Sequence, residues 1–393
     1  MPPQSGEVAR TGTVGARTVF SSQQIKHPGG LQTMVLYEKF YATIAATRIA
    51  SAMGAVVECW SIDQIEEKYG VLERLDSYEH YNTGWKRVPG TTEDGIERQK
   101  LMCGAIMDKQ DRITAADLIA WWRKVLDPEK MPFMTEGFDV QLFQIAQSGL
   151  VPANELGRFC PHFHINTTGR SFHAIPLINA GDLAGMMEDL YEIGGVYQHP
   201  NSLAFPWGKV YNAAMVEALT PGATPDSVLE AGMKFADAGM REQIGQVLAI
   251  AGKYDDPLDM RREVNRLYDN RSGSYPLSWI DENVTKSLAI FHKCHGDVRS
   301  AIITGVNFGR DTDCTAASAA GLAAAFAGPE TIPSRWIEEV DAATRENPYT
   351  NSRLTIKETA EGMIEAYRGK VDKLVARVAV MENLIRPEPK GLS

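Results

Sequence analysis

Two short acidic segments carry the residue types best suited to metal or acid–base chemistry. In the first, Asp311 and Asp313 stand two residues apart, ahead of a run of small residues, within Gly309-Arg310-Asp311-Thr312-Asp313-Cys314-Thr315. Carboxylate and hydroxyl oxygens are the ligands that Mg²⁺, Mn²⁺ and Ca²⁺ prefer. The same residues would also suit the start of a helix, where acidic side chains interact favourably with the helix dipole. Both interpretations stay open for this segment alone.

The second acidic segment precedes a helical pattern through Met107 and reads Thr91-Thr92-Glu93-Asp94-Gly95-Ile96-Glu97. Alone, it is again explained by a helix cap. Two such segments, far apart in the chain, could instead converge on one oxygen-rich site. A third acid, Glu58, ends an apolar run that begins at Gly54. It is either an exposed residue at a helix end or a carboxylate that is costly to bury without a partner.

Composition excludes several classes of function. Of the 393 residues, 44% are hydrophobic and 23% are charged, which is typical of a folded globular protein and too apolar for a disordered chain. The 40 Lys and Arg residues against 50 Asp and Glu residues give a net charge of -10. We therefore expect no nucleic-acid partner and no attraction to anionic membranes.

Cysteine usage and hydropathy bear on location. The five cysteines are scattered, with no closely spaced pair, which favours a reducing, cytoplasmic environment. No stretch of about 18 apolar residues is apparent, so we expect no membrane span. The N-terminus also lacks the apolar core of a signal peptide.

Helical patterns dominate the elements that must position the acids. Residues 1–30 are rich in Gly, Ser, Thr, Gln and Pro, and we expect them to form a mobile tail. From Leu31, apolar residues recur mainly at spacings of three and four, which predicts a helix to about Val57. Further helix-start signals follow at Thr114, Thr224, Pro333 and Thr355.

Strand patterns are scarce by comparison. The β-branched segment 301–306 equally fits a buried helix. No Gly/Ser linker and no internal repeat divides the rest of the chain. We therefore predict an all-α protein, with a single compact multi-helix domain over residues 31–393.

The C-terminal segment carries one long apolar stripe. Its members follow one another at spacings of three or four: Ile356, Ala360, Met363, Tyr367, Val371, Leu374, Val378, Met381 and Ile385. This spacing predicts a long helix that packs on the body of the domain, or a seam that joins two copies of the chain. We favour the packed helix, and the oligomeric state stays open.

Five motifs, in their order along the chain, resemble those of the ADP-ribosylglycohydrolases. They are Gly54-Ala55-Val56-Val57-Glu58, Thr92-Glu93-Asp94, the central loop Asn166-Thr167-Thr168-Gly169-Arg170-Ser171-Phe172-His173-Ala174-Ile175-Pro176, Gln198-His199, and Gly309-Arg310-Asp311-Thr312-Asp313. Ile332-Pro333 with Trp336 also looks like the segment that usually follows the last motif. The shared order, rather than any one motif, carries the resemblance.

The resemblance implies an all-α fold with two divalent metal ions at the mouth of a cleft. The ions are usually Mg²⁺ and sometimes Mn²⁺, and Ca²⁺ would suit the same oxygens. By position, the metal ligands would be Thr92, Glu93, Asp94, Asp311 and Asp313, with Thr315 as a possible substitute ligand. The catalytic residues would be Glu58, Glu93, Asp94 and Asp313, with Glu58 helping to activate water. The substrate would contact Thr167, Thr168, Gly169, Arg170, Ser171, His173, His199, Gly309 and Arg310. Residues 167–171 would turn backbone N–H groups toward phosphate or ribose oxygens.

Three departures from the family pattern alter the expected pocket. Cys314 stands where the family commonly has Thr, and sulfur is a poor ligand for Mg²⁺. Glu93 lengthens the first acid of the usual Asp pair by one methylene. His173 stands where the family often has Arg, which removes a permanent charge. We therefore expect the metal site to be kept and the substrate pocket to be altered.

The implied chemistry is hydrolysis of a C1″ glycosidic bond of ribose through an oxocarbenium-like transition state. We predict that the substrate is an ADP-ribosyl conjugate, either a small molecule or an ADP-ribosylated protein. The three departures leave open a hydrolase for a smaller N-riboside, such as a nucleotide or an NAD-derived metabolite. The change to Cys314 also leaves open a protein that binds a ribosyl ligand without cleaving it.

Overall fold

The computed structural model describes residues 36–80 and 83–385. Within these residues the fold is all-α, as the sequence predicts, with one short antiparallel hairpin in which Tyr78 lies opposite Arg87. The predicted mobile tail over residues 1–30 lies outside the described residues. The described residues belong to one compact unit, Met34–Ser393.

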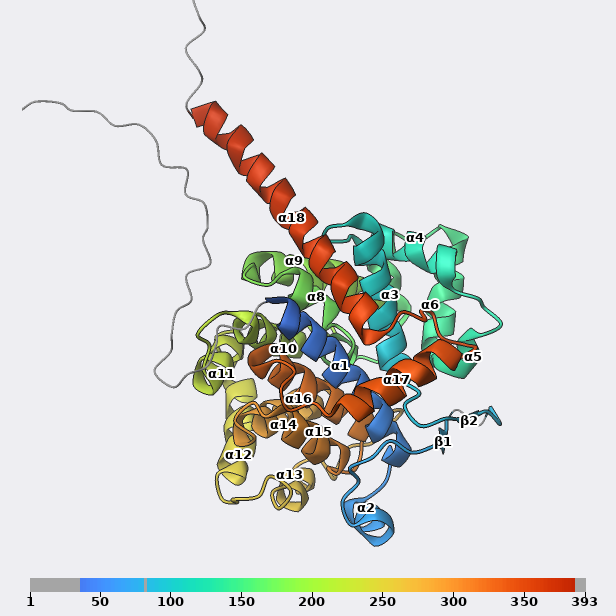
Figure 1. Ribbon diagram of the computed structural model, residues 1–393, viewed down its shortest axis with the longest axis vertical. Helices are drawn as coiled ribbons and strands as arrows, with labels where there is room; N and C mark the ends of the chain where they lie inside the picture. The colour runs from blue at the N-terminus through green and yellow to red at the C-terminus, as the bar shows by residue number, and fades with distance from the viewer. Residues whose placement is uncertain (1–35, 81–82, 386–393) are drawn as a thin grey trace, which may run out of the picture. The chain divides into compact units, whose positions relative to one another are not determined.

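Figure 1 shows the arrangement of the elements. In chain order they are α1 (Leu36–Gly54), the 3₁₀ turn η1 (Ala55–Val57), α2 (Ile62–Tyr69), β1 (Tyr78–Glu79), β2 (Lys86–Arg87), α3 (Asp94–Lys109), α4 (Ala115–Val125), α5 (Met131–Met134), α6 (Gly137–Ser148), the 3₁₀ segment η2 (Ala153–Phe159), α7 (Thr167–Arg170), α8 (Ala174–Ile178), α9 (Leu183–Tyr197), α10 (Ala204–Leu219), α11 (Pro225–Met233), α12 (Ala238–Ala251), α13 (Arg261–Arg266), α14 (Ile280–Lys293), α15 (Val298–Val306), α16 (Thr312–Ala327), α17 (Ser334–Glu346) and α18 (Ile356–Ile385). The β-branched segment 301–306 is helical, as part of α15.

Helix α1 is central to the core because its side chains are small or apolar on nearly every side. It packs most extensively against α16 and also contacts α15, α17 and α18. With η1 it forms a stretch, Leu36–Val57, that is long and apolar enough to cross a membrane. The expectation that no such stretch exists is therefore wrong. However, 89% of its most apolar window is buried inside the domain, which is typical of the core helix of a folded protein.

The predicted helix starts are confirmed by their caps. Thr114 and Thr224 each form a capping box, in which the side chains of the first and fourth residues bond to each other's backbone N–H. Thr355 and Glu358 make the same reciprocal pair, at 3.1 and 2.8 Å. Pro333 is the N-cap of α17. These local signals need no tertiary contact, which is why the sequence alone reveals them.

The C-terminal helix α18 divides into a packed half and an exposed half. Ile356, Ala360 and Met363 are fully buried, and the helix contacts α1, α3 and α8 in this half. From Val371 onward every described side chain is exposed, up to 79% at Leu384. Figure 1 shows α18, in red, continuing beyond α3 and α8. The prediction of a packed helix is therefore right for the first half and wrong for the second.

Candidate active site

The turn that leads into α16 carries Asp311 and Asp313 and is tied to the chain that follows α1. Arg310, in a left-handed conformation with φ of 65°, accepts the N–H of Cys59 through its carbonyl oxygen at 2.8 Å. This contact brings the neighbouring Glu58 within electrostatic reach of both aspartates. The first and last acidic motifs of the sequence therefore meet in space.

The second acidic segment is held against α1 as well. Glu93 is the N-cap of α3, and its Oε2 accepts the N–H of Gly95 at 2.7 Å. Its Oε1 accepts the hydroxyl of Ser51, on α1, at 2.7 Å. Asp94 is the first residue of α3 and lies beside Glu93. Because α1 contacts both acidic segments, it acts as the scaffold of the cluster.

The guanidinium of Arg170 joins the two acidic segments. Nη1 lies 2.7 Å from Oε2 of Glu93 and 3.1 Å from Oδ2 of Asp313. Nη2 lies 2.5 Å from Oδ2 of Asp94. The arginine expected to contact substrate is therefore paired with three of the predicted metal ligands.

Asp311 and Asp313 have the properties of a cation site. Oδ1 of each is buried and has no hydrogen-bond partner within the described part of the chain, while Oδ2 of Asp311 accepts from the side chain of Asn166 at 3.0 Å. A buried carboxylate oxygen without a partner is costly unless an ion satisfies it. The Cys314 sulfur lies in the same group, whose ligand atoms are all within 4.8 Å of one another. Thr315 follows Asp311 by one helical turn and donates its N–H to the carbonyl oxygen of Asp311 at 3.1 Å.

Burial and mutual repulsion govern the charges of the cluster. Burial, and then the neighbouring carboxylates, raise the pKa of Glu58 and Asp313 well above the usual range. Burial also raises the pKa of Glu93, although Arg170 opposes the shift. Burial would raise the pKa of Asp94 too, but neighbouring guanidinium groups hold it well below its usual range. An added cation would relieve the repulsion among these carboxylates.

Glu58 and His80 form the solvent-exposed edge of the cluster. Their side chains are 22% and 20% exposed, and His80 Nδ1 lies 3.3 Å from Glu58 Oε2. The other four acids are only 1–4% exposed. Burial, followed by nearby Arg87, lowers the pKa of His80 to about 4, so the imidazole is neutral near pH 7.

A family model described as ADP-ribosylglycohydrolase matches residues 32–372, which is most of the chain. The chain belongs to the ADP-ribosylglycohydrolase family. It is therefore an enzyme of the glycoside hydrolase class, in a metal-dependent family that acts on ADP-ribosyl conjugates. A solved structure described as an ADP-ribosylglycohydrolase-related protein complex has the same fold, with a TM-score of 0.54 and 15% identity over 85% of this chain and 98% of that chain. No curated protein matches the sequence.

In the central loop of this ADP-ribosylglycohydrolase, three of the backbone N–H groups expected to face a ligand are bonded to carbonyl oxygens of the loop itself. The backbone N–H groups of Gly169 and Arg170 donate to the carbonyl oxygen of Asn166, and that of Ser171 donates to Thr167, at 2.9–3.1 Å. These three N–H groups close the short helix α7. The hydroxyl of Thr167 accepts from Gln198 at 3.2 Å, and that of Thr168 donates to Ala204 at 2.6 Å. The loop also places the guanidinium of Arg170 among the acids.

The two predicted substrate-contact histidines make contacts with neighbouring protein groups. His173 is fully buried, and its Nε2 lies 2.9 Å from the hydroxyl of Tyr211. It fills space beside Gly321 of α16, where a Cβ atom would lie 2.5 Å from Nε2. His199 accepts the N–H of Asn201 at 3.1 Å and so stabilises the turn after α9. Neither contact supports a role in binding substrate.

Three further predicted residues are held by protein contacts. The guanidinium of Arg310 forms two bonds to Glu282, at 2.7 and 2.9 Å. Gly309 packs on the start of α2 with φ of 75°, a conformation that favours glycine. The hydroxyl of Thr92, a predicted metal ligand, accepts from Nζ of Lys100 at 3.3 Å. Gly309 and Arg310 therefore shape the turn that carries Asp311.

Sequence reasoning missed several residues of the site. Arg98 follows Asp94 by one helical turn, a spacing that could have revealed the ion pair, which measures 2.6 Å. Asn166 opens the central loop, but nothing in the sequence indicates its bond to Asp311. Ser51 and His80 carry no local signal, because only the fold brings them to the acids.

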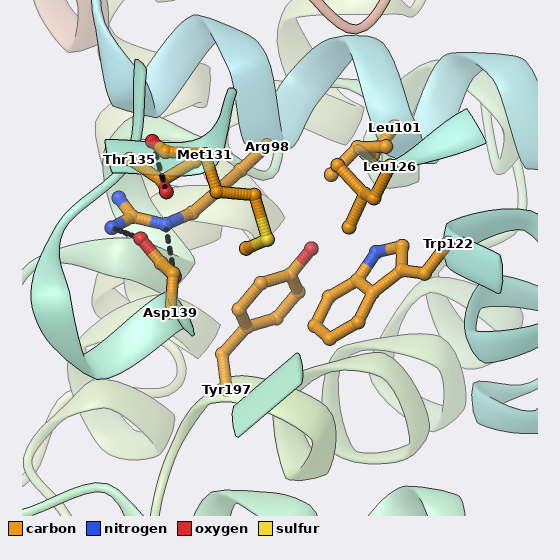
Figure 2. Close-up of a pocket in the computed structure, with 8 residues that line it drawn as sticks. All are labelled: Arg98, Leu101, Trp122, Leu126, Met131, Thr135, Asp139 and Tyr197. Atoms are coloured by element: carbon orange, nitrogen blue, oxygen red, sulfur yellow. Dashed lines mark hydrogen bonds and ion pairs between the residues drawn. The ribbon is translucent and has the colours of Figure 1, made fainter. Parts of the chain in front are cut away.

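A second acidic group, which shares Asp94 with the first, surrounds Arg98. Arg98 pairs with Asp94, Glu136 and Asp139, each at 2.6 Å. Beyond this group lies a cavity of about 10 Å³, shown in Figure 2, which is lined in part by Arg98, Trp122 and Tyr197. That volume suits about one water molecule and no substrate. The acids around Arg170 are therefore the better candidate for the active site.

Proposed function

We propose that this chain is a metal-dependent hydrolase that cleaves the C1″ glycosidic bond of ribose in an ADP-ribosyl conjugate. Family membership supports the class of reaction. The observation that carries the proposal is the convergence, from three distant segments, of the acids Glu58, Glu93, Asp94, Asp311 and Asp313. A buried group of carboxylates this dense calls for a bound cation.

Asp311 and Asp313 would hold the divalent ion, since each has a buried oxygen without a protein partner. Mg²⁺ suits these hard oxygen ligands best, and Mn²⁺ would also suit them. When bound, such an ion supplies Lewis acidity toward ribose hydroxyls and water. Burial of Asp311 and Asp313 limits competition from bulk water at the same oxygens.

Glu58 would accept a proton from the attacking water at its carboxylate. It is the acid at the solvent-exposed edge, where His80 orients it through a 3.3 Å contact. The buried carboxylates of Glu93 and Asp313 would stabilise the positive charge that develops on the ribose ring. No covalent intermediate is needed in this scheme.

We also propose a cytoplasmic location. All five cysteines are free of disulfide bonds, and four of them are buried. Free thiols in a chain of this size are typical of a reducing compartment.

The proposal is tested with purified protein, Mg²⁺ or Mn²⁺, and a panel of ADP-ribosylated proteins, small ADP-ribose conjugates, NAD and nucleosides. Mass spectrometry should detect free ADP-ribose, and a chelator should abolish its release. Asp311→Asn should reduce the rate by about a hundredfold or more, since it removes an ionic group of the active site. Asp63→Asn is the control, because this carboxylate is 79% exposed and pairs with Arg262, which is itself 49% exposed.

Two outcomes would contradict the proposal. Cleavage confined to nucleosides or nucleotides would replace the ADP-ribosyl substrate by a smaller N-riboside. Binding of ADP-ribose without cleavage of any panel member would indicate a ribosyl-ligand binder.

A further inference from the structure

Arg170 fills the space among three of the carboxylates that the family resemblance assigns to metal ions. Its side chain is only 7% exposed, and its two terminal nitrogens lie 2.5–3.1 Å from Glu93, Asp94 and Asp313. A guanidinium is planar and permanently charged, and it binds several carboxylates at once. It therefore neutralises negative charge at the place where a divalent ion would otherwise do so.

The start of α3 provides the space for this guanidinium, because residue 95 is a glycine. A Cβ atom on Gly95 would lie 2.6 Å from Nη1 of Arg170, so a larger residue would displace the group. Helix α7 supplies the arginine from the other side, with the Arg170 N–H bonded to Asn166 at 3.1 Å. The backbone of α3 therefore leaves space for the guanidinium, and the backbone of α7 holds the arginine that fills it.

The motif Thr92-Glu93-Asp94 has little capacity left for an ion. Both oxygens of Glu93 already accept hydrogen bonds, Oε1 from Ser51 and Oε2 from Gly95 as well as Arg170, each at 2.7 Å. Oδ2 of Asp94 is shared between Arg170 and a second arginine, Arg98.

The last acidic motif differs in this respect. Oδ1 of Asp311 and Oδ1 of Asp313 are both buried and lack a hydrogen-bond partner in the part of the chain that the structure describes. The two aspartates are 4% and 2% exposed, so water does not readily supply the missing partner. Arg170 also contacts Oδ2 of Asp313, at 3.1 Å, so the two motifs differ in the unpartnered Oδ1 atoms of the two aspartates. These atoms still need a cation.

We infer that Arg170 replaces one of the two metal ions implied by the family, so that the chain binds a single divalent ion at Asp311 and Asp313. The inference rests on the proposed function and specifies the composition of the same site. Unlike a bound ion, the Arg170 side chain is covalently part of the protein, so it stays in the site at any metal concentration. The chain therefore keeps one positive charge in the cluster in the absence of metal.

Metal stoichiometry tests the inference without any measurement of turnover. Native mass spectrometry and isothermal titration calorimetry with Mn²⁺ should give one ion per wild-type chain. Arg170→Ala vacates the position and should bind two, while Arg170→Lys keeps a positive charge and should still bind one. Two ions or none in the wild type, or a single ion in Arg170→Ala, would overturn the inference.

A second comparison avoids any change at Arg170, in case its alanine variant does not fold. Asp311→Asn should raise the Kd for Mn²⁺ by about tenfold or more, because it changes a ligand. Glu93→Gln should leave that Kd nearly unchanged, because Glu93 faces Arg170 and not the ion. An equal rise in the Kd for Mn²⁺ in both variants would show that the ion lies between Glu93 and Asp311, which contradicts the inference.

The results separate this inference from the proposed function. One bound ion in a protein that cleaves no ribosyl bond contradicts the function alone. Two bound ions in a metal-dependent hydrolase contradict this inference alone.

Discussion

At the scale of single residues, the missing side chain of Gly54 sets how closely the acidic segments approach. A Cβ atom there would lie 2.5 Å from Cα of Asp313, closer than real atoms come. The carbonyl oxygen of Gly54 also accepts the hydroxyl of Thr312 at 2.8 Å. The end of α1 and the start of α16 are thus in direct backbone contact, which places Asp313 next to the other acids.

We expect Gly54→Ala to displace α16 and lower the free energy of unfolding by about 1–3 kcal/mol, as overpacking does. Urea denaturation followed by circular dichroism measures this change. Gly245→Ala is the matched control, because Gly245 lies within α12 with no atom near its Cβ position. The control should gain stability by about 0.5–1 kcal/mol, since alanine favours a helix over glycine. Similar effects of the two substitutions would contradict the close contact.

His173 should make stability depend on pH. Burial lowers its pKa from 6.5 to about 3 in the folded state. Between pH 6.5 and about 3, the unfolded chain binds one proton more than the folded chain does. The contribution of neutral His173 to the free energy of unfolding is therefore complete above pH 6.5 and is lost as the pH falls. The loss is about 1.4 kcal/mol per pH unit. His173→Gln should flatten the fall in unfolding free energy between pH 6.5 and 4.5, measured by urea denaturation. Parallel pH curves for the two proteins would show that the histidine is not held neutral.

The residues of the site were only partly predictable. Asp311, Asp313, Glu93 and Asp94 stand in local motifs, so their grouping by the fold is foreseeable from the resemblance. Arg170 is different, because the sequence does not reveal whether a loop arginine faces a ligand or a carboxylate. The same holds for the backbone N–H groups of Gly169, Arg170 and Ser171, which bond within α7. Whether they bond internally depends on φ and ψ values that the motif does not specify.

At the scale of elements, α18 combines two different environments in one helix. The family match ends at residue 372, close to Val371, where the side chains of the helix become exposed. The apolar stripe continues past this point without interruption. The sequence therefore predicts the helix and its apolar face. It cannot reveal where along α18 the contacts with the rest of the domain end.

Two methionines of the α18 stripe test this division. Met363 is fully buried and Met381 is 57% exposed. Met363→Ala should lower the free energy of unfolding by about 2–5 kcal/mol, because it leaves a cavity. Met381→Ala should change it by less than about 0.5 kcal/mol, as is usual for surface substitutions. A comparable loss at Met381, in chemical denaturation, would show that the second half of α18 is covered in solution.

At the scale of the whole molecule, the helices concentrate negative charge in the interior of a chain that is already acidic. Four acids of the cluster are at most 4% exposed, and Arg170 pairs with three of them. The all-α class was predictable because caps and spacing are local. The clustering has no such local signal and was foreseeable only through the family resemblance, because it depends on α1 contacting both acidic segments.

Ion binding should therefore stabilise the entire fold. At a Mn²⁺ concentration about a hundredfold above Kd, the free energy of unfolding should rise by about 2.7 kcal/mol, since the unfolded chain has no preformed site. Urea denaturation with Mn²⁺ and with chelator measures the difference. Asp311→Asn should remove most of the gain. An equal gain in that variant would place the stabilising ion elsewhere.

The most direct test of the account is the release of ADP-ribose by chelator-treated protein as Mn²⁺ is added back. Wild-type protein should be inactive at first, and the rate should rise to a plateau as the ion binds at Asp311 and Asp313. Asp311→Asn should stay near the starting rate across the same titration, while Asp63→Asn should follow the wild type. Full release of ADP-ribose in the chelator-treated protein would contradict a metal-dependent hydrolase built on these acids.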